Sequence, residues 1–269
     1  MRGGARVTGA VPDGETLDGK QRKLMSRPAE LAALALRRLL RDAGWSAPRD
    51  AGLFLGVGAS GGAVDELAAL IDASREGDTL SPARLGREGL AACTPLLAFQ
   101  LMNNFTLCHG AIQEGLAGPN AAFFSRGAGT VLALCEALAA LDEGDCERAV
   151  AGAADSALHP VTWAELTREG RAARPPSEAA ALLALSPAPH GALAVIEEAS
   201  PRSAAVDGAH VVLRPADVAA ALGESLAAIP ALAWCAAVDL IAGGAARRVA
   251  VAGDALDGDA GVVVFGAPP

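Results

Sequence analysis

The stretch GPNAAFFSRGAGTVLALCEALAALDEGDCERAVAGAAD, residues 118–155, decides the fold of this chain. It predicts a short strand at residues 121–125, a sharp turn with two glycines at 126–129, a long helix at 130–141 and a second strand at 148–151. The helix is apolar on every face except at Glu136. A helix of this kind must be covered on all sides, so we expect it in the middle of a domain.

The same pattern recurs one hundred positions further along the chain. The helix cysteine, the glycine that follows the helix and the arginine before the next strand all have counterparts, as Cys135 and Cys235, Gly144 and Gly244, and Arg148 and Arg248. Self-similarity at this distance indicates two copies of one α/β half, because solenoid arrays repeat at intervals of about 20–50 residues. The conserved order of these features favours duplication over chance similarity in an alanine-rich sequence.

The composition excludes several classes of function. The chain has 269 residues, of which 52% are hydrophobic and only 3% aromatic, so its core consists of Ala, Leu and Val packed closely between helix and sheet. The formal net charge of −9 argues against a nucleic-acid or anionic membrane partner, since both favour a basic surface. No uninterrupted apolar run approaches the roughly 18 residues of a membrane span.

The cysteines and histidines give no sign of a metal site. The five cysteines form no CxxC pair and lie mostly in apolar contexts, so we expect buried free thiols in a reducing cytosol. The four histidines lack the spacing of a metal-binding pair, and neither a metal nor a cofactor is expected. The first ten residues, interrupted by Arg2 and Arg6, show no signal-peptide pattern, so the expected location is cytoplasmic.

Strands and helices alternate along the rest of the chain. Helices are predicted at residues 28–43, 63–73, 95–115 (broken near residues 103–104) and 217–242. Further strands are predicted at residues 6–10, 53–57, 179–185, 191–197, 247–252 and 261–265. The strands at 179–185 and 191–197 are expected to form an antiparallel pair across residues 186–190. Residues 75–89 and 162–176 are expected to be polar, solvated connections. Glu136 and Asp239 lie within apolar helices and are expected to be buried hydrogen-bonded groups or to face a cavity.

This alternation predicts an α/β fold, and two apolar helices with sheets on both sides predict a layered αβαβα sandwich. In that setting the central stretch resembles the β-ketoacyl synthases, the thiolase-fold condensing enzymes of fatty-acid and polyketide assembly. The resemblance is carried by GPN at residues 118–120, SRGA at 125–128, EA at 136–137 and AGAAD at 151–155. It extends to KQRKLM at residues 20–25, the strand and glycine loop at 53–62, MNN at 102–104 and LGESLAA at 222–228. It implies a thiolase-like sandwich of two pseudo-repeated halves in one compact unit, residues 1–200 and a shortened second half, residues 201–269.

The departures from the family pattern concern its catalytic residues. The family's nucleophilic cysteine aligns with Gly127, and the histidine of its LGHTLGA motif aligns with Glu224. Its second histidine has no counterpart, because His210 is followed by two valines. Condensation needs a thiolate to carry the acyl chain and imidazoles to assist decarboxylation and stabilise the oxyanion. The sequence therefore predicts a ketosynthase-like chain that is not an enzyme by itself, resembling the chain-length factors of type II polyketide systems.

This resemblance implies a heterodimer with an active ketosynthase. The expected contact across the dimer axis is the strand before the nucleophile position, Ala121, Ala122, Phe123, Phe124 and Ser125. Phe105 and Phe124 are expected to help line the partner's acyl tunnel. Because the chain is acidic, we expect an acidic acyl carrier protein to dock mainly on the partner.

Three alternatives remain at the level of sequence. Residues 58–62 fit GxSxG, so Ser60 could be a hydrolase nucleophile with Asp155 and His190 as partners. Residues 56–61 also fit GxGxxG, but Asp72 lies in a helical stretch and not at the end of a strand, where a dinucleotide site needs its acidic residue. A structural scaffold that never touches the acyl chain is the third alternative.

Overall fold

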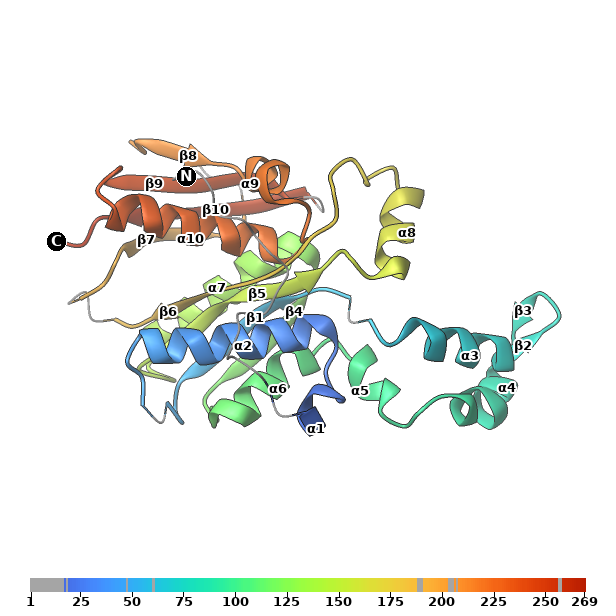
Figure 1. Ribbon diagram of the computed structural model, residues 1–269. Coiled ribbons are helices and arrows are strands. Elements are labelled where there is room, and N and C mark those ends of the chain that lie inside the picture. The colour runs from blue at the N-terminus through green and yellow to red at the C-terminus, as the bar shows by residue number, and fades with distance from the viewer. Residues whose placement is uncertain are drawn as a thin grey trace.

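Two stacked four-stranded sheets form the frame of the molecule (Figure 1). The computed structural model describes residues 17, 19–46, 48–59, 61–187, 191–202, 206, 208–255 and 258–269. The first sheet has the order β4-β1-β5-β6, with bounds Asn120–Phe124, Gly52–Val57, Ala149–Ser156 and Glu178–Leu185. The second sheet has the order β7-β10-β9-β8, with bounds Val195–Ser200, Gly258–Gly266, Arg248–Ala255 and Val211–Leu213.

The first sheet is parallel through β4, β1 and β5, and β6 runs antiparallel to β5. Every residue of β1 and β5 is buried, because helices cover both faces of the sheet. The outer face carries α2 (Arg27–Asp42) and α6 (Phe105–Glu114). Helix α2 starts where the sequence predicts it: the Ser26 hydroxyl accepts a hydrogen bond from the backbone N–H of Ala29, and Pro28 occupies the first turn.

Two helices lie between the sheets, α7 (Arg126–Asp142) and α10 (Ala228–Ala242). Their apolar residues, among them Leu134 and Trp234, belong to one cluster with strands of both sheets, which confirms the predicted middle layer. Glu136 and Asp239 are exposed, however, so the prediction that these two groups are buried is wrong. The sheets cover the middle layer from above and below, and each helix keeps a polar edge toward solvent.

The predicted duplication is confirmed at the residue level. Gly144 and Gly244 end their helices with φ of 77° and 71°, and donate to the carbonyls of Leu141 and Ile241 at 3.2 and 2.9 Å. Each helix then leads into a strand with a parallel neighbour on one side and an antiparallel one on the other. The left-handed conformation explains why glycine occupies both positions.

The second half has fewer helices than the first. Helices α7, α9 (Pro215–Leu222) and α10 pack on the face of the second sheet that carries Val249, Val251, Val263 and Phe265. On the opposite face Ala250, Val262 and Val264 form a small cluster with Val206, Ala209 and Ala252. In the described part of the chain, helices therefore cover one face of this sheet, as expected for a shortened half of a layered α/β protein.

Several predicted connections differ from the structure. Strands β6 and β7 do not pair: β6 pairs with β5, and β7 pairs with β10 in the other sheet. Apolar residues in a strand-like pattern indicate a strand but do not determine which strand it pairs with. The chain therefore passes from the first sheet to the second before the expected boundary at residue 200. The predicted helix at residues 217–242 is two helices, α9 and α10, and residues 162–176 begin with α8 (Pro160–Arg168).

Residues 64–102 form what we call the arm, which stands away from the two sheets at the right of Figure 1. Its elements are α3 (Val64–Ser74), β2 (Arg75–Glu76), β3 (Thr79–Leu80), α4 (Pro82–Arg84), a π-helix (Leu85–Gly89), a 3₁₀-helix (Leu90–Ala92) and α5 (Leu97–Leu101). The sequence predicts α3 and the break before α6, but residues 75–89 were expected to be loop. The short helix α1 (Gly19–Arg22) precedes α2. The candidate strand at residues 6–10 lies outside the described residues, as do Ser60 and His190.

The five cysteines are free thiols; Cys146 is buried and the other four are half-buried. Among the described residues, no helix is long and apolar enough to cross a membrane.

Candidate functional site

The candidate site lies where the carboxyl ends of β4, β1 and β5 meet the first turn of α7. Strand β4 ends at Phe124, Ser125 makes the corner with φ −164° and ψ 80°, and α7 begins at Arg126. Residues 126–129, predicted to be a turn before the helix, are thus its first turn. Gly127 is buried in this turn, at the end of the sheet where ligands commonly bind in α/β proteins.

Glycines allow this first turn to lie directly on the strands. A Cβ built on Gly129 would lie 2.8 Å from the carbonyl oxygen of Phe123, and one built on Gly56 would lie 2.7 Å from Cα of Thr130. Both distances are shorter than any real carbon contact, so alanine would push the helix away from the strands. The glycines of SRGAG act through close approach, one of the two roles that the sequence suggests for them.

Position 127 offers no nucleophile, because glycine has neither a thiol nor a hydroxyl. Cys135 is the next thiol along α7, two helical turns further on. It is half-buried, and its burial raises the pKa of the thiol, with Glu136 adding to the effect. This thiol therefore does not replace the missing nucleophile: it lies two turns away, and its raised pKa disfavours the thiolate.

Asp155, the penultimate residue of β5, joins the two halves of the molecule. Its Oδ1 accepts the backbone N–H of Ser156 at 2.8 Å, and its Oδ2 accepts that of Ala227, just before α10, at 3.1 Å. Gly58 lies against the carboxylate and leaves no room there for a side chain. The side chain is fully buried, and this burial raises its pKa to about 7 although the two N–H donors and Arg126 favour the charged form.

Glu224, at the position where the family has a histidine, is also committed to structure. It is 3% exposed; Oε1 accepts the backbone N–H of Leu226 at 2.9 Å, and Oε2 pairs with Arg174 at 3.2 Å. The hydroxyl of Thr130 on α7 donates to the carbonyl of Ala227 at 2.6 Å. The backbone of Ala227 is thus held at its N–H by Asp155 and at its carbonyl by Thr130.

These residues bring two buried carboxylates to the first turn of α7, and no thiol or imidazole is among them. Asp155 and Glu224 are close enough that the charge of Glu224 raises the pKa of Asp155. A carboxylate pair at this place would also raise the pKa of a neighbouring thiol, which is the opposite of what a nucleophilic cysteine needs. The arrangement fastens the two halves together.

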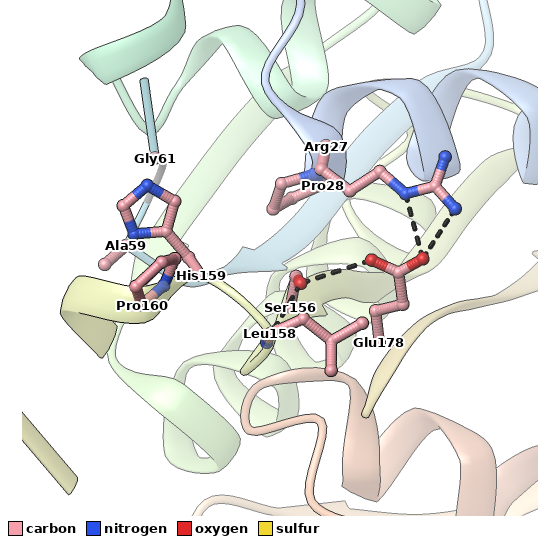
Figure 2. A pocket seen from close by; sticks show the side chains of 9 residues that line it. All are labelled: Arg27, Pro28, Ala59, Gly61, Ser156, Leu158, His159, Pro160 and Glu178. Carbon is pink, nitrogen blue, oxygen red and sulfur yellow. Dashed lines mark hydrogen bonds and ion pairs between the residues drawn. The ribbon is translucent and has the colours of Figure 1, made fainter. Parts of the chain in front are cut away.

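A pocket of about 240 Å³, lined in part by Ser156, the residue after Asp155, adjoins the site (Figure 2). Its charged groups satisfy one another: Arg27 donates to Oε1 of Glu178 from Nε at 2.9 Å and from Nη2 at 2.5 Å. The Ser156 hydroxyl donates to Oε2 of Glu178 at 3.3 Å, and His159 Nε2 lies 3.0 Å from the carbonyl oxygen of Gly62. The hydrogen bond to Glu178 raises the pKa of Arg27.

Sequence reasoning misses this network. Arg27 and Glu178 are 151 residues apart, and no motif links them. The only available signal is that each is a charged first residue of a structural element, Arg27 of α2 and Glu178 of β6.

The residues predicted for the dimer contact lie on an edge strand. Strand β4 pairs only with β1, and its other edge is unpaired among the described residues. Phe124 is 62% exposed and Ser125 is exposed, whereas Ala121, Ala122 and Phe123 are half-buried.

The two residues predicted to line a tunnel are placed differently. Phe105 is half-buried at the start of α6, with its ring centroid 5.1 Å from that of Phe99 and 5.4 Å from that of His109. Phe124 lies at the exposed end of β4, and neither residue lines the pocket of Figure 2. Their role at an acyl chain stays a prediction.

The residues of the alternative sites are not brought together. Asp155 has both oxygens bound to backbone N–H groups, and its proposed partners Ser60 and His190 lie outside the described residues. Asp72 is exposed on α3. Within the described residues, no group of three or more His, Cys, Asp or Glu side chains could hold a metal ion.

Two stacked sheets with a pair of buried helices between them, built from two repeats, define the thiolase-like class of α/β proteins. The sequence itself identifies the family: residues 10–182, more than half of the chain, match the model of the β-ketoacyl synthase N-terminal domain. The chain therefore belongs to the β-ketoacyl synthase family. A search of curated proteins found no match.

Solved structures of similar fold come from the same group. One is AntDE:AntF, a type II polyketide synthase acyl carrier protein in complex with its ketosynthase, with TM-score 0.72, 14% identity and coverage of 93% of this chain and 85% of that chain. The ishigamide ketosynthase/chain length factor has TM-score 0.63, 15% identity and coverage of 91% and 83%. A β-ketoacyl synthase from Burkholderia phymatum STM815 has TM-score 0.66, 15% identity and coverage of 97% and 86%. At these identities the likeness shows the fold alone.

Proposed function

We propose that this chain is a non-catalytic, ketosynthase-like subunit of the chain-length-factor kind. In this proposal it pairs with an active ketosynthase and shapes the acyl tunnel during polyketide chain elongation. The observation that carries the proposal is Gly127, which occupies the family's nucleophile position in the first turn of α7. A glycine there can form no acyl thioester.

The surrounding residues support the same conclusion. The family's histidine position is Glu224, whose carboxylate accepts the N–H of Leu226 and pairs with Arg174. Asp155 accepts two backbone N–H groups from different halves. Replacing a nucleophile and a base by groups that serve only the fold is consistent with a chain released from catalysis.

Pairing with another subunit is supported by the edge of the first sheet. An edge strand presents unpaired N–H and C=O groups, and proteins cover such edges or use them for association. Strand β4 is an edge strand of five residues, and Phe124 at its end is 62% exposed. Among proteins of this fold, the ishigamide structure is described as a ketosynthase/chain length factor. An acyl carrier protein would then dock mainly on the partner, since this chain has a net charge of −9.

The catalytic part of the proposal is tested by acyl loading. The chain is produced alone and together with an intact ketosynthase from the same gene neighbourhood, and each sample is exposed to malonyl and acetyl thioesters. Intact-mass measurement should find an acyl thioester on the ketosynthase and none on this chain, and the two should copurify. An acyl thioester on this chain alone, or carbon–carbon bond formation without the ketosynthase, would overturn the proposal.

A scaffold that never touches the acyl chain differs in one measurable way. If this chain shapes the tunnel, the larger side chain of Phe124→Trp or the smaller one of Phe105→Ala should change the length of the product made by the complex. An unchanged product from a complex of normal yield would favour the scaffold.

A further inference from the structure

The connection between β5 and β6, residues 157–177, buries few of its side chains. The structure describes it without a gap, and within it only Ala157, Thr162 and Leu166 are buried. Helix α8 lies in its first half and stands apart from the two sheets in Figure 1. A segment with so little burial opens more easily than the core beside it.

The two ends of this connection are fixed to the body of the molecule. At the neck, the N–H of Ala157 donates to the carbonyl of Ser177 at 2.9 Å. The N–H of Glu224 donates to the carbonyl of Pro175, and the N–H of Ser177 donates to the carbonyl of Glu224, both at 2.8 Å. Movement is therefore confined to residues 158–173, between these two fixed ends.

The apolar contact of α8 with the body is a small cluster of its own. Leu166 packs with Ala157 and with Leu226, which precedes α10, and the half-buried Trp163 packs against them. This cluster is separate from the large core between the two sheets. A small cluster of this kind can separate while the main core stays intact.

Two polar contacts also tie residues 158–173 to the body. Glu169 pairs with Arg126, the first residue of α7, at 3.3 Å, and the two side chains are 32% and 25% exposed. His159 Nε2 lies 3.0 Å from the carbonyl oxygen of Gly62. A partly exposed ion pair contributes little to stability and is screened by salt, so it can break and re-form readily.

The pocket of Figure 2 lies between this segment and the body. Three of its nine lining residues, Leu158, His159 and Pro160, belong to residues 158–173, and the other six belong to the body. One of those six is Ser156, which is only 4% exposed. A movement of residues 158–173 would therefore open the pocket and uncover Ser156.

We propose that residues 158–173 form a lid over this pocket and over the first turn of α7. The lid opens as one unit, when α8 separates from Leu226 and Glu169 separates from Arg126. Opening gives a small ligand access to the pocket. This inference goes beyond the proposed function, because it concerns access to a pocket of this chain and needs no partner subunit.

The test measures how often the lid opens by labelling a thiol placed beneath it. Ser156→Cys is nearly isosteric, and peptide mass mapping after iodoacetamide treatment distinguishes the new thiol from the natural ones. Each labelling rate is divided by the rate of the same thiol in the urea-unfolded chain. The new thiol should then react about tenfold faster, or more, than the buried Cys146, and its rate should depend only weakly on urea below the unfolding transition.

The ion pair is tested by adding Glu169→Ala to this variant. Labelling of the new thiol should become about threefold faster and should lose its dependence on salt, because the pair that salt screens is absent. The matched control is Glu165→Ala, which removes the same charge one turn earlier in α8. Glu165 is exposed and makes no ion pair with a described residue, so labelling should change by less than about 1.5-fold.

A second measurement needs no thiol. Hydrogen-bonded amides of α8 should exchange as a group with one weak dependence on urea, and Glu169→Ala should speed all of them by the same factor. Labelling of the new thiol as slow as that of Cys146, with α8 amides that exchange only on global unfolding, would overturn the lid. Fast labelling that neither salt nor Glu169→Ala changes, with α8 amides that exchange independently of one another, would also overturn it, since the pocket then opens by another route.

Discussion

Asp155 shows how a single side chain joins the two halves of this molecule. Its carboxylate is fully buried and accepts one N–H from its own strand and one from Ala227, at the entrance to α10. Two N–H donors favour the charged form, but desolvation has the larger effect and raises the pKa from the usual 3.8 to about 7. The buried group therefore holds a proton under mildly acidic conditions that it would have lost in the unfolded chain.

This shift predicts that stability falls between pH 5 and pH 8. Because the folded pKa is above the unfolded one, the contribution of Asp155 is complete below the unfolded pKa and is lost as pH rises through about 7. One pKa unit corresponds to about 1.4 kcal/mol, so the wild type should lose about 2–3 kcal/mol across this range relative to Asp155→Asn, which cannot titrate. Urea unfolding at both pH values measures the difference. Asp72→Asn, on the exposed face of α3, is the control, and parallel pH curves for wild type and Asp155→Asn would contradict the prediction.

Glu224 is expected to be a structural residue where the family has a base. Glu224→Ala leaves the N–H of Leu226 without its acceptor and Arg174 without its partner, so it should lower the free energy of unfolding by about 2–4 kcal/mol. The control is Glu169→Ala, which breaks the more exposed pairs with Arg126 and Arg171 and should cost less than about 1 kcal/mol. Denaturant unfolding measures both. Equal costs would mean that the buried position of Glu224 does not matter.

At the scale of elements, the site depends on how closely α7 approaches β1. Gly56→Ala places a methyl group against the backbone of Thr130, and we expect this overpacking to cost about 1–3 kcal/mol or more. Gly86→Ala in the arm is the control, because a Cβ there meets nothing within 4 Å and should change stability by less than about 1 kcal/mol. Thermal unfolding distinguishes the two. A harmless Gly56→Ala would show that α7 can shift without cost.

Elements defined by local patterns could be predicted from the sequence, whereas the start of α7, which depends on its contact with β1, could not. Helix α2 and strand β1 follow from local patterns of apolar residues and from Ser26 and Pro28, so their predicted bounds agree with the structure within one residue. The start of α7 could not be placed, because Gly127 and Gly129 count locally against a helix and are needed only when the strands beneath are present. Glu136 and Asp239 do mark the side of each helix that stays open to solvent, but an otherwise apolar helix led to the prediction that both groups are buried.

The candidate site was predictable only in part, for a related reason. Aligned motifs locate Gly127 and Glu224, which belong to segments joined by the hydrogen bond from Thr130 to Ala227. No pattern reports that Asp155 bonds to Ala227 or that Arg27 bonds to Glu178, because each pair joins segments far apart in the chain. Hydrogen bonds of this kind depend on the packing of the two halves.

At the scale of the whole molecule, the two halves share one core. The largest cluster of buried side chains combines Ala151 of the first sheet, Val249 and Val263 of the second, and Val131 and Trp234 of the helices between them. A core that spans both sheets cannot be separated into two independent hydrophobic units. We therefore expect both halves to unfold in one cooperative transition, although their sequences are repeats.

Trp234 provides the test of this cooperativity. It is fully buried, so Trp234→Ala should lower the free energy of unfolding by about 3–5 kcal/mol. Trp234→Phe keeps an aromatic ring and removes an Nε1 that has no hydrogen-bond partner in the described structure, so it should cost less. With Trp163→Phe also present in the reference and in both variants, Trp45, which packs against the core beneath the first sheet, reports on that half by fluorescence. If one core serves both halves, the Trp45 transition and the circular dichroism transition shift together to lower denaturant; a Trp45 transition that stays at the wild-type midpoint would show that the halves unfold separately.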